Sequence, residues 1–302
     1  MQNKQPGFAI VTHGGAGESL DLTDGAERAA KDGHARFLAG GEALDAAIAA
    51  VVVFEEDERF NAGTGSVLCL DGSTVEMDAS IMDTRGRLGA AAAVRDVRNP
   101  VLLARAISDT PHVLLAGEGA ERFARAIGLP QAKPISEEQR EKHRKLLCQL
   151  AGSVPVMPGV GNRLFDRFWN YKTPLQLPPS KACDTVGAVV RTPDGHFAVA
   201  GSTGGSAPSL LGRVGDTAIV GAGFYAGTHG AIAATGIGEH IVRHMLARTV
   251  YGWIEAGMPL QQALQRGIDL FDKEVDIGLI AVTKTEAGSC SNKTMPTAKI
   301  ED

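Results

Sequence analysis

The chain has 302 residues, enough for one large domain or two ordinary ones. Hydrophobic residues make up 44% of it and charged residues 22%, a composition typical of soluble globular proteins. Thirty basic against 35 acidic residues give a net charge of −5 without a basic stripe, so neither nucleic acid nor an anionic membrane is an expected partner.

The cysteines and the apolar segments indicate a compartment. The four cysteines form no CxxC pair, which favours reduced thiols over a zinc site or a disulfide framework. Residues 1–7 are polar and lack the apolar core of a signal peptide. The longest apolar stretch, residues 46–54, is too short to span a bilayer. We therefore expect a cytoplasmic protein.

The first half of the chain alternates between strand and helix signals. The expected elements are a strand over 8–12, helices over 24–38 and 42–55, short strands between 66 and 97, and helices over 101–108 and 118–127. Gly40 and Gly41 are a typical helix stop. Asn99 and Pro100 have the residue types of an N-cap and a first helical position.

From residue 130 to about 181 the character changes. A charged stretch over 137–145 predicts a solvated helix, and several prolines follow with little periodicity. We expect an exposed linker, the kind of segment in which proteolysis concentrates. It ends at the Asp184–Thr185 junction.

The segment after Thr185 begins with a clear hairpin signal. Strands are expected over 185–190 and 197–200, with a turn at 193–195. Helices over 231–250 and 260–273 and a strand over 277–282 should follow. Strand pairs followed by helices in both halves predict antiparallel sheets with helices packed outside.

Several common chemistries lack their motifs. The sequence contains no Gly-x-Ser-x-Gly elbow, no phosphate-binding Gly-Lys-Ser/Thr and no His-Glu-x-x-His zinc helix. Residues 218–227 look like a strand that enters a dinucleotide-binding glycine turn, so an NAD(P) enzyme is one hypothesis. The apolar strand with a terminal acidic residue that would contact the ribose is missing downstream, which disfavours it.

Thr185 is the strongest candidate nucleophile. A threonine hydroxyl needs a base beside it, and a free α-amino group on the same residue is one such base. This amine titrates near ~7.7–8.0, so much of it is unprotonated at neutral pH. Cleavage of the linker before Thr185 would create it. The alternative is a strand that merely begins with a β-branched residue.

Three downstream motifs favour the catalytic interpretation. Thr203 is expected to meet Thr185 across the hairpin. Arg213 and Asp216, three residues apart between glycines, are suited to the carboxylate and amino groups of an amino acid, although a surface ion pair is the simpler alternative. Thr235 and the N–H of Gly236 are candidates for an oxyanion hole, with a packing turn as the alternative.

Seven motifs in this order resemble one family, the plant-type asparaginases, isoaspartyl aminopeptidases and glycosylasparaginases among the N-terminal nucleophile hydrolases. They are His13–Gly17, Asn61–Gly65, Asp184–Ala188, Ser202–Gly205, Gly212–Asp216, Gly221–Gly223 and Thr235–Gly236. The resemblance spans about residues 8–282. It implies an α+β fold, a four-layer αββα sandwich of two antiparallel sheets in a single domain, 1–302. It also implies self-cleavage between Asp184 and Thr185 into an α chain, 1–184, and a β chain, 185–302.

The resemblance also implies roles for individual residues. Thr185 would attack a β-aspartyl amide, Thr203 would hydrogen-bond this nucleophile, and Asn61 would support its amine. Thr235 and Gly236 would stabilise the oxyanion. Arg213 would bind the substrate α-carboxylate and Asp216 its α-amino group. The residues expected to line the substrate site are Arg213, Val214, Gly215, Asp216, Thr235, Gly236, Ile237 and Gly238.

The family also suggests an ion and an assembly. A structural sodium ion would be held by backbone carbonyls of Phe54, Glu55, Asp57, Phe60, Ala62 and Thr64. Catalysis would need no cofactor. The expected partners are a small-molecule or dipeptide substrate and further αβ units in a homo-oligomer.

The motifs leave the substrate open. Asp184 before the nucleophile is as in glycosylasparaginases, whereas residues 61–63 and 202–205 look like the isoaspartyl peptidase branch. Isoaspartyl dipeptides and L-asparagine are therefore the first expectation, and N-glycosyl asparagine is the alternative. A non-catalytic, unprocessed relative that acts as a binding module is a further hypothesis.

Overall fold

The computed structural model describes residues 7–69, 71–150, 170, 185–206 and 209–302, and in helix α5 it leaves out the side chains of residues 142 and 145–150. The strands are β1 Ala9–His13, β2 Met77–Asp83, β3 Leu88–Val94, β4 Leu114–Ala116, β5 Val186–Arg191, β6 Phe197–Thr203, β7 Phe224–Gly227, β8 Gly230–Gly236, β9 Ile277–Thr283, β10 Ala287–Ser291 and β11 Thr297–Glu301. The helices are α1 Thr23–Leu38, α2 Ala43–Glu56, α3 Pro100–Ile107, α4 Gly117–Ala126, α5 Glu137–Leu150, α7 Gly238–His244, α8 Leu246–Glu255 and α9 Leu260–Ile268. Short 3-10 turns lie at Leu20–Leu22 and Gly63–Gly65.

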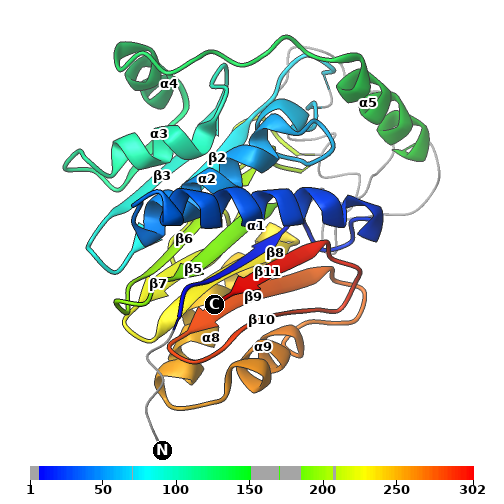
Figure 1. The fold of residues 1–302 in the computed structure, drawn as a ribbon. Coiled ribbons are helices and arrows are strands. Elements are labelled where there is room, and N and C mark those ends of the chain that lie inside the picture. Colours follow the sequence, from blue (N-terminus) through cyan, green and yellow to red (C-terminus); the bar gives the residue numbers. More distant parts are fainter. Residues whose placement is uncertain (1–6, 70, 151–169, 171–184, 207–208) are drawn as a thin grey trace, which may run out of the picture.

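The larger sheet has seven strands in the order β11-β1-β5-β6-β2-β3-β4 (Figure 1). Neighbouring strands are antiparallel except β3 and β4, which run parallel. β5 lies between β1 and β6, and Gly187 of β5 is opposite His13 of β1. Strands from before and after the Asp184–Thr185 junction are therefore interleaved in one sheet.

The smaller sheet has four antiparallel strands in the order β10-β9-β8-β7. In β8, Thr235 is opposite Gly278 of β9. All these strands come from the part of the chain after Thr185.

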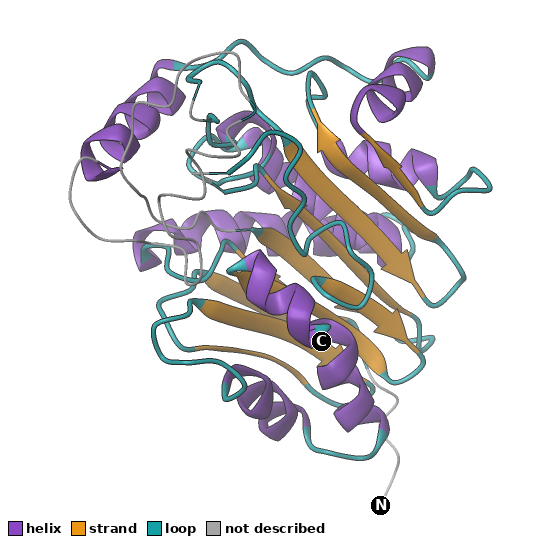
Figure 2. Ribbon diagram, turned by 180° about the vertical axis from the view of Figure 1, so that it is seen from behind, coloured by secondary structure: helices purple, strands orange, loops and turns teal. Residues whose placement is uncertain are grey.

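The strands that stack against each other are buried on both faces. In β5, Val186, Ala188 and Val190 pack with helices α1 and α2, whereas Val189 packs between the two sheets. β9 alternates in the same way between the helices α8 and α9 and the space between the sheets. The result is a helix–sheet–sheet–helix sandwich, with α1 and α2 over the large sheet and α8 and α9 over the small one (Figures 1 and 2). The expected α+β, four-layer αββα fold is confirmed, apart from the parallel β3–β4 pair.

The prediction of one helix over 231–250 was wrong. Residues 230–236 form strand β8, and two helices follow, α7 and α8, joined at Met245 in the left-handed conformation with a φ of 44°. β8 is buried along nearly its whole length, so its apolar residues show no alternation. Alanine and isoleucine without alternation fit a buried helix as well as a buried strand.

The predicted N-cap of α3 also differs. Asn99 precedes Pro100 as expected, but its side chain makes no capping bond. The N–H of Val101 instead donates to Glu55 Oε1 at 2.9 Å, so α2 caps α3 across the helix layer. The linker predicted over 130–181 is described up to residue 150 and at residue 170, and the rest lies outside the described residues.

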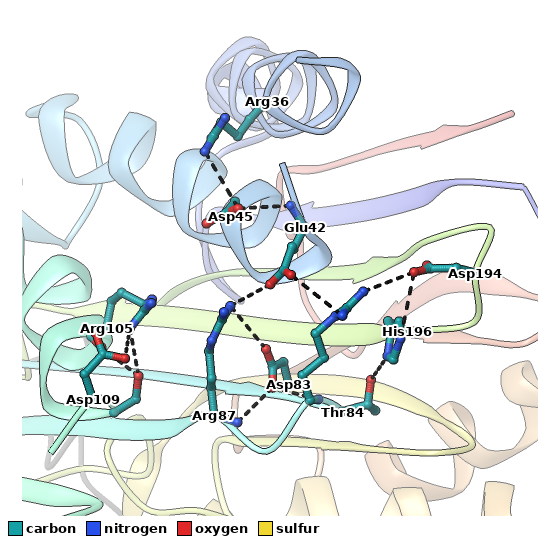
Figure 3. Close-up of polar contacts among 12 residues, drawn as sticks. Arg36, Glu42, Asp45, Asp83, Thr84, Arg87, Arg105, Asp109, Asp194 and His196 are labelled. Atoms are coloured by element: carbon teal, nitrogen blue, oxygen red, sulfur yellow. Dashed lines mark hydrogen bonds and ion pairs between the residues drawn. The ribbon is translucent and has the colours of Figure 1, made fainter. Parts of the chain in front are cut away.

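The β2–β3 turn and the β5–β6 turn meet at one end of the large sheet (Figure 3). Arg87 donates to Glu42 at 2.8 Å, and Arg85 pairs with Glu42 and with Asp194. Asp83, beneath them, accepts the backbone N–H groups of Arg85 and Arg87, both at 2.9 Å. This polar network ties the N-terminus of α2 to the end of the sheet that lies away from Thr185. Among the described helices, none is long and apolar enough to cross a membrane.

Candidate active site

Thr185 lies immediately before β5, between the two sheets, and is 6% exposed. Its N–H donates to Oγ1 of Thr235 at 3.3 Å, and the Thr235 hydroxyl donates to the carbonyl of Thr185 at 3.3 Å. Thr235 is fully buried on β8 of the small sheet. The two sheets therefore meet through the main chain of the expected nucleophile and the side chain of the expected oxyanion residue.

The hydroxyl of Thr185 lies against a residue that sequence reasoning missed. Thr185 Oγ1 is 3.3 Å from Thr217 Oγ1, and Thr217 is 3% exposed. The one sequence signal for Thr217 is its position directly after Asp216. Thr203, the expected partner, lines the same cavity, and its hydroxyl accepts the N–H of Gly205 at 3.1 Å.

A small cavity opens beside Thr185. Its lining comes from β6, from the loop before β7 and from the start of α7: Thr185, Thr203, Gly205, Ser206, Arg213, Gly215, Asp216, Thr217, Gly236, Ile237, Gly238 and Glu239. Six of the eight residues expected at the substrate site thus line it. Of the other two, Val214 packs against the cluster of Ala90, Ala92 and Ala218, and Thr235 hydrogen-bonds the main chain of Thr185.

Arg213 is held by a carboxylate that sequence reasoning also missed. Its Nε and Nη2 donate to the two carboxylate oxygens of Glu239 at 2.8 and 2.9 Å. Glu239 is the second residue of α7 and lies 26 positions from Arg213, so no local sequence motif predicts the pair. Burial opposes charge on Arg213, but the bonds from Glu239 raise the pKa of the guanidinium above its ordinary value. The arginine therefore enters the cavity as a fixed cation.

Asp216 is buried beside Arg213, with an exposed fraction of 3%. Among the described residues its Oδ2 atom has no hydrogen-bond partner. Burial raises the pKa of this carboxyl to about 7, against the opposing charge of Arg213. Gly238 makes room for both groups, because a Cβ there would lie 2.9 Å from Arg213 Nη2 and 2.9 Å from Asp216 Oδ1. A buried carboxylate with one oxygen free of hydrogen bonds at a cavity is suited to bind an ammonium group.

His13 lies under the start of β5. Gly187 allows its close approach, because a Cβ there would lie 2.5 Å from His13 Nε2. Burial lowers the pKa of His13 to about 3, with a smaller opposing effect from the backbone of Thr185. The imidazole is therefore neutral and a very weak base, a poor acceptor for a hydroxyl proton.

Asn61 braces the turn that follows β6. Its Nδ2 donates to the carbonyl of Gly205 at 2.8 Å, and its own carbonyl accepts the N–H of Gly204 at 2.9 Å. Its Oδ1 accepts the N–H of Val67 at 3.0 Å. These bonds place Asn61 one layer behind the cavity, where it fixes the chain next to Thr203.

The loop expected to hold sodium is crowded with backbone oxygens. A Cβ at Gly65 would lie 2.0 Å from the carbonyl oxygen of Phe60, and one at Gly63 would lie 2.5 Å from that of Glu55. The carbonyls of Phe54, Asp57, Phe60 and Ala62 each accept one backbone N–H, and a carbonyl oxygen has two lone pairs. The part of the chain that the structure describes contains no metal-binding group of three or more His, Cys, Asp or Glu side chains. The loop fits a hard cation held by carbonyl oxygens, without side-chain ligands.

Asp184, on the other side of the expected cleavage site, lies outside the described residues. Thr185, the residue that cleavage would expose, is described together with all of β5.

Comparison with known proteins adds an independent finding. A family model described as Asparaginase matches residues 6–300. An isoaspartyl peptidase/L-asparaginase from Mus musculus is 38% identical over 98% of this chain and 88% of its own length. A plant-type L-asparaginase from Pyrococcus furiosus is 41% identical over 88% of this chain and 85% of its own length. An isoaspartyl peptidase/L-asparaginase from Macaca fascicularis is 38% identical over 97% and 93%. The similarity covers the cavity, both sheets and the helices that enclose them.

Proposed function

Because the chain belongs to the asparaginase family, we propose that it is a self-cleaving threonine hydrolase of β-aspartyl amides, with isoaspartyl dipeptides and L-asparagine as substrates. One observation carries the proposal: the hydroxyl of Thr185 borders a cavity that also holds a fixed arginine and a buried carboxylate, Arg213 and Asp216. The names of the relatives from Mus musculus and Pyrococcus furiosus support the same substrate class.

The first reaction is the maturation of the chain. The Thr185 hydroxyl attacks the carbonyl carbon of Asp184, the peptide C–N bond breaks, and the hydroxyl proton passes to the leaving nitrogen. The resulting ester joins Asp184 to Thr185 Oγ1, and water hydrolyses it to a carboxylate and the free hydroxyl. Thr185 then carries an α-amino group, and the chain consists of an α part, 1–184, and a β part, 185–302.

The second reaction is turnover. The α-amino group takes the proton from the Thr185 hydroxyl as Oγ1 attacks the side-chain amide carbon of the substrate. The Thr235 hydroxyl and the N–H of Gly236 stabilise the negative oxygen that develops. The amide C–N bond breaks, and the proton passes to the leaving amine. Water then hydrolyses the acyl ester and releases aspartate. His13, beside Thr185, is neutral and weakly basic. At neutral pH the α-amine is the better proton acceptor of the two, which supports the amine as the base.

Recognition of the aspartyl group follows from two charges. The guanidinium of Arg213 pairs with the substrate α-carboxylate, and the carboxylate of Asp216 pairs with its α-amino group. The nucleophile lies on the other side of the cavity and meets the β-carbonyl. In a normal aspartyl peptide the α-carboxyl forms the peptide bond, so the α-carboxylate that Arg213 would bind is absent. The proposal therefore predicts selection of β-aspartyl bonds.

A substrate panel tests the proposal. Purified protein should release aspartate from isoaspartyl dipeptides and from L-asparagine, and Thr185→Ala should release none, because the hydroxyl is lost. N-glycosyl asparagine belongs in the panel because Asp184 precedes the nucleophile. Wild-type protein that binds L-aspartate but hydrolyses none of these amides would instead support a non-catalytic binding module.

We also infer that the loop from Phe54 to Gly65 binds a structural sodium ion through its carbonyl oxygens. An ion that binds the folded state alone raises the midpoint of thermal unfolding. The midpoint should therefore be higher in sodium chloride than in choline chloride at equal ionic strength. Equal midpoints in the two salts would count against a sodium site.

A further inference from the structure

The loop that carries Arg213 and Asp216 has no regular secondary structure, so other groups have to hold it. Residues 212–216 follow β6 and precede β7 without joining either sheet. Two of its backbone N–H groups are bound by carboxylates at the start of β2, those of Glu76, directly before the strand, and Asp78, within it. The N–H of Gly212 donates to Glu76 Oε2 at 2.7 Å, and the N–H of Gly215 donates to Asp78 Oδ2 at 3.1 Å.

The second oxygen of each carboxylate is also engaged, on the side of the sheet. Asp78 Oδ1 accepts the N–H of Ala93 on β3 at 2.8 Å. Ala93 has a φ of 47°, in the left-handed region, and lies where the β2–β3 register shifts. Glu76 Oε1 accepts Nη2 of Arg95 at 2.6 Å. Asp78 therefore bridges strand β3 and the substrate loop, and Glu76 bridges Arg95, directly after β3, and the same loop.

Both carboxylates are buried. Asp78 is 2% exposed and Glu76 is 9% exposed. Burial raises the pKa of Asp78, and the N–H groups of Ala93 and Gly215 act in the opposite direction. A buried carboxylate destabilises a fold unless hydrogen bonds compensate it. Burying Asp78 therefore lowers the stability of the fold, but its two carboxylate oxygens can accept hydrogen bonds from two backbone amides at once.

We propose that Asp78 and Glu76 are positioning residues that hold the substrate-binding loop, residues 212–216, so that Arg213 and Asp216 face the substrate. The inference rests on the proposed function in that this loop recognises the α-carboxylate and α-amino groups. Asp78 is the stronger anchor, because Gly215 lies directly between Arg213 and Asp216. Asparagine cannot replace it, since its NH₂ group would face one of the two N–H donors.

The test measures binding of L-aspartate, which carries both recognised groups but undergoes no reaction. Asp78→Asn should weaken its binding about tenfold or more in calorimetry, the effect of losing a charge-assisted hydrogen bond in the site. Glu76→Gln should weaken it by a smaller factor, because Glu76 anchors Gly212 at the start of the loop, whereas Asp78 anchors Gly215 between Arg213 and Asp216. In turnover of an isoaspartyl dipeptide, KM should rise while kcat changes little, because the Thr185 side of the cavity is intact.

Asp83→Asn is the matched control. Asp83 lies at the other end of β2, is 6% exposed, and also accepts two backbone N–H groups, those of Arg85 and Arg87 (Figure 3). It should lose comparable stability and keep the wild-type affinity for L-aspartate. Should Asp78→Asn fail to fold, the affinity of Glu76→Gln for L-aspartate tests the inference instead. Glu76 is less buried than Asp78, so its substitution should disturb the fold less.

Two outcomes would overturn the inference. One is wild-type affinity in a folded Asp78→Asn protein, or in Glu76→Gln where Asp78→Asn does not fold. The other is equal loss of affinity in Asp83→Asn. A protein that binds L-aspartate in an Asp78-dependent way but hydrolyses no amide would contradict the proposed function and leave this inference standing.

Discussion

The hydroxyl of Thr185 faces the hydroxyl of Thr217, with their Oγ1 atoms 3.3 Å apart. Thr217 directly follows Asp216, the residue proposed to bind the substrate amine. Adjacent residues therefore serve different groups: Thr217 contacts the nucleophile, and Asp216 is proposed to bind the substrate.

Thr217→Val should lower kcat for an isoaspartyl dipeptide about three- to tenfold, because it removes one neutral hydrogen bond to the nucleophile without changing the side-chain volume much. Thr217→Ser keeps the hydroxyl and should recover most of the rate. The control is Thr192→Val, an equally buried hydroxyl at the far end of β5. Wild-type kcat in Thr217→Val would show that this contact does not orient the nucleophile.

The pH dependence of substrate binding should report Asp216. Burial raises the pKa of Asp216 to about 7. The charged form binds the substrate amine, so this interaction is present above pH 7 and is lost as the pH falls through 7. We expect KM for L-asparagine to rise in this range, by up to about tenfold for each pH unit below the pKa.

The proposed α-amine of Thr185, whose unperturbed pKa is ~7.7–8.0, would also lower kcat in acid. Succinamic acid separates the two effects, because it is L-asparagine without the α-amino group. Its KM should lack the rise that Asp216 causes. Identical acid limbs of KM for both compounds would refute the role of Asp216.

Gly238→Ala should impair binding without unfolding the protein. Its Cβ would lie 2.9 Å from both Arg213 Nη2 and Asp216 Oδ1, so at least one of these groups must move. KM should rise at least several-fold, since each displaced charge weakens a charge-assisted hydrogen bond. Gly119→Ala, in α4, meets no atom within 4 Å and should leave KM unchanged. Unchanged KM in Gly238→Ala would mean that the cavity is more pliable than its geometry indicates.

The sequence predicted the parts of the fold whose signals are local. The hairpin around residues 193–195 and the helices α1, α2 and α9 have turn residues or periodicity in one short window. β8 was missed because burial on both faces removes the alternation that marks a strand. β11 pairs with β1, almost the whole chain away, and such a pairing leaves no local pattern.

The site residues differ in the same way: those in local motifs were predicted, and those placed by long-range contacts were not. Thr185, Arg213 and Asp216 stand in glycine-rich motifs, so their residue types and spacing suggested chemistry before the structure did. Thr217 and Glu239 act through contacts across 32 and 26 positions, and an isolated threonine or glutamate carries no such signal. Glycine-rich motifs thus indicate where the backbone approaches a site. The side chains that orient the site residues are brought there by tertiary packing, which leaves no local sequence pattern.

A free α-amine at Thr185 is the proposed base of the reaction, and intact mass spectrometry of active enzyme can detect the cleavage that creates it. We expect two polypeptides of about 19 and 12 kDa, in proportion to residue number within 31.5 kDa, and an N-terminal threonine at position 185 on the smaller one. Thr185→Ala should stay at the full mass. A single uncut polypeptide that hydrolyses isoaspartyl dipeptides would contradict the account.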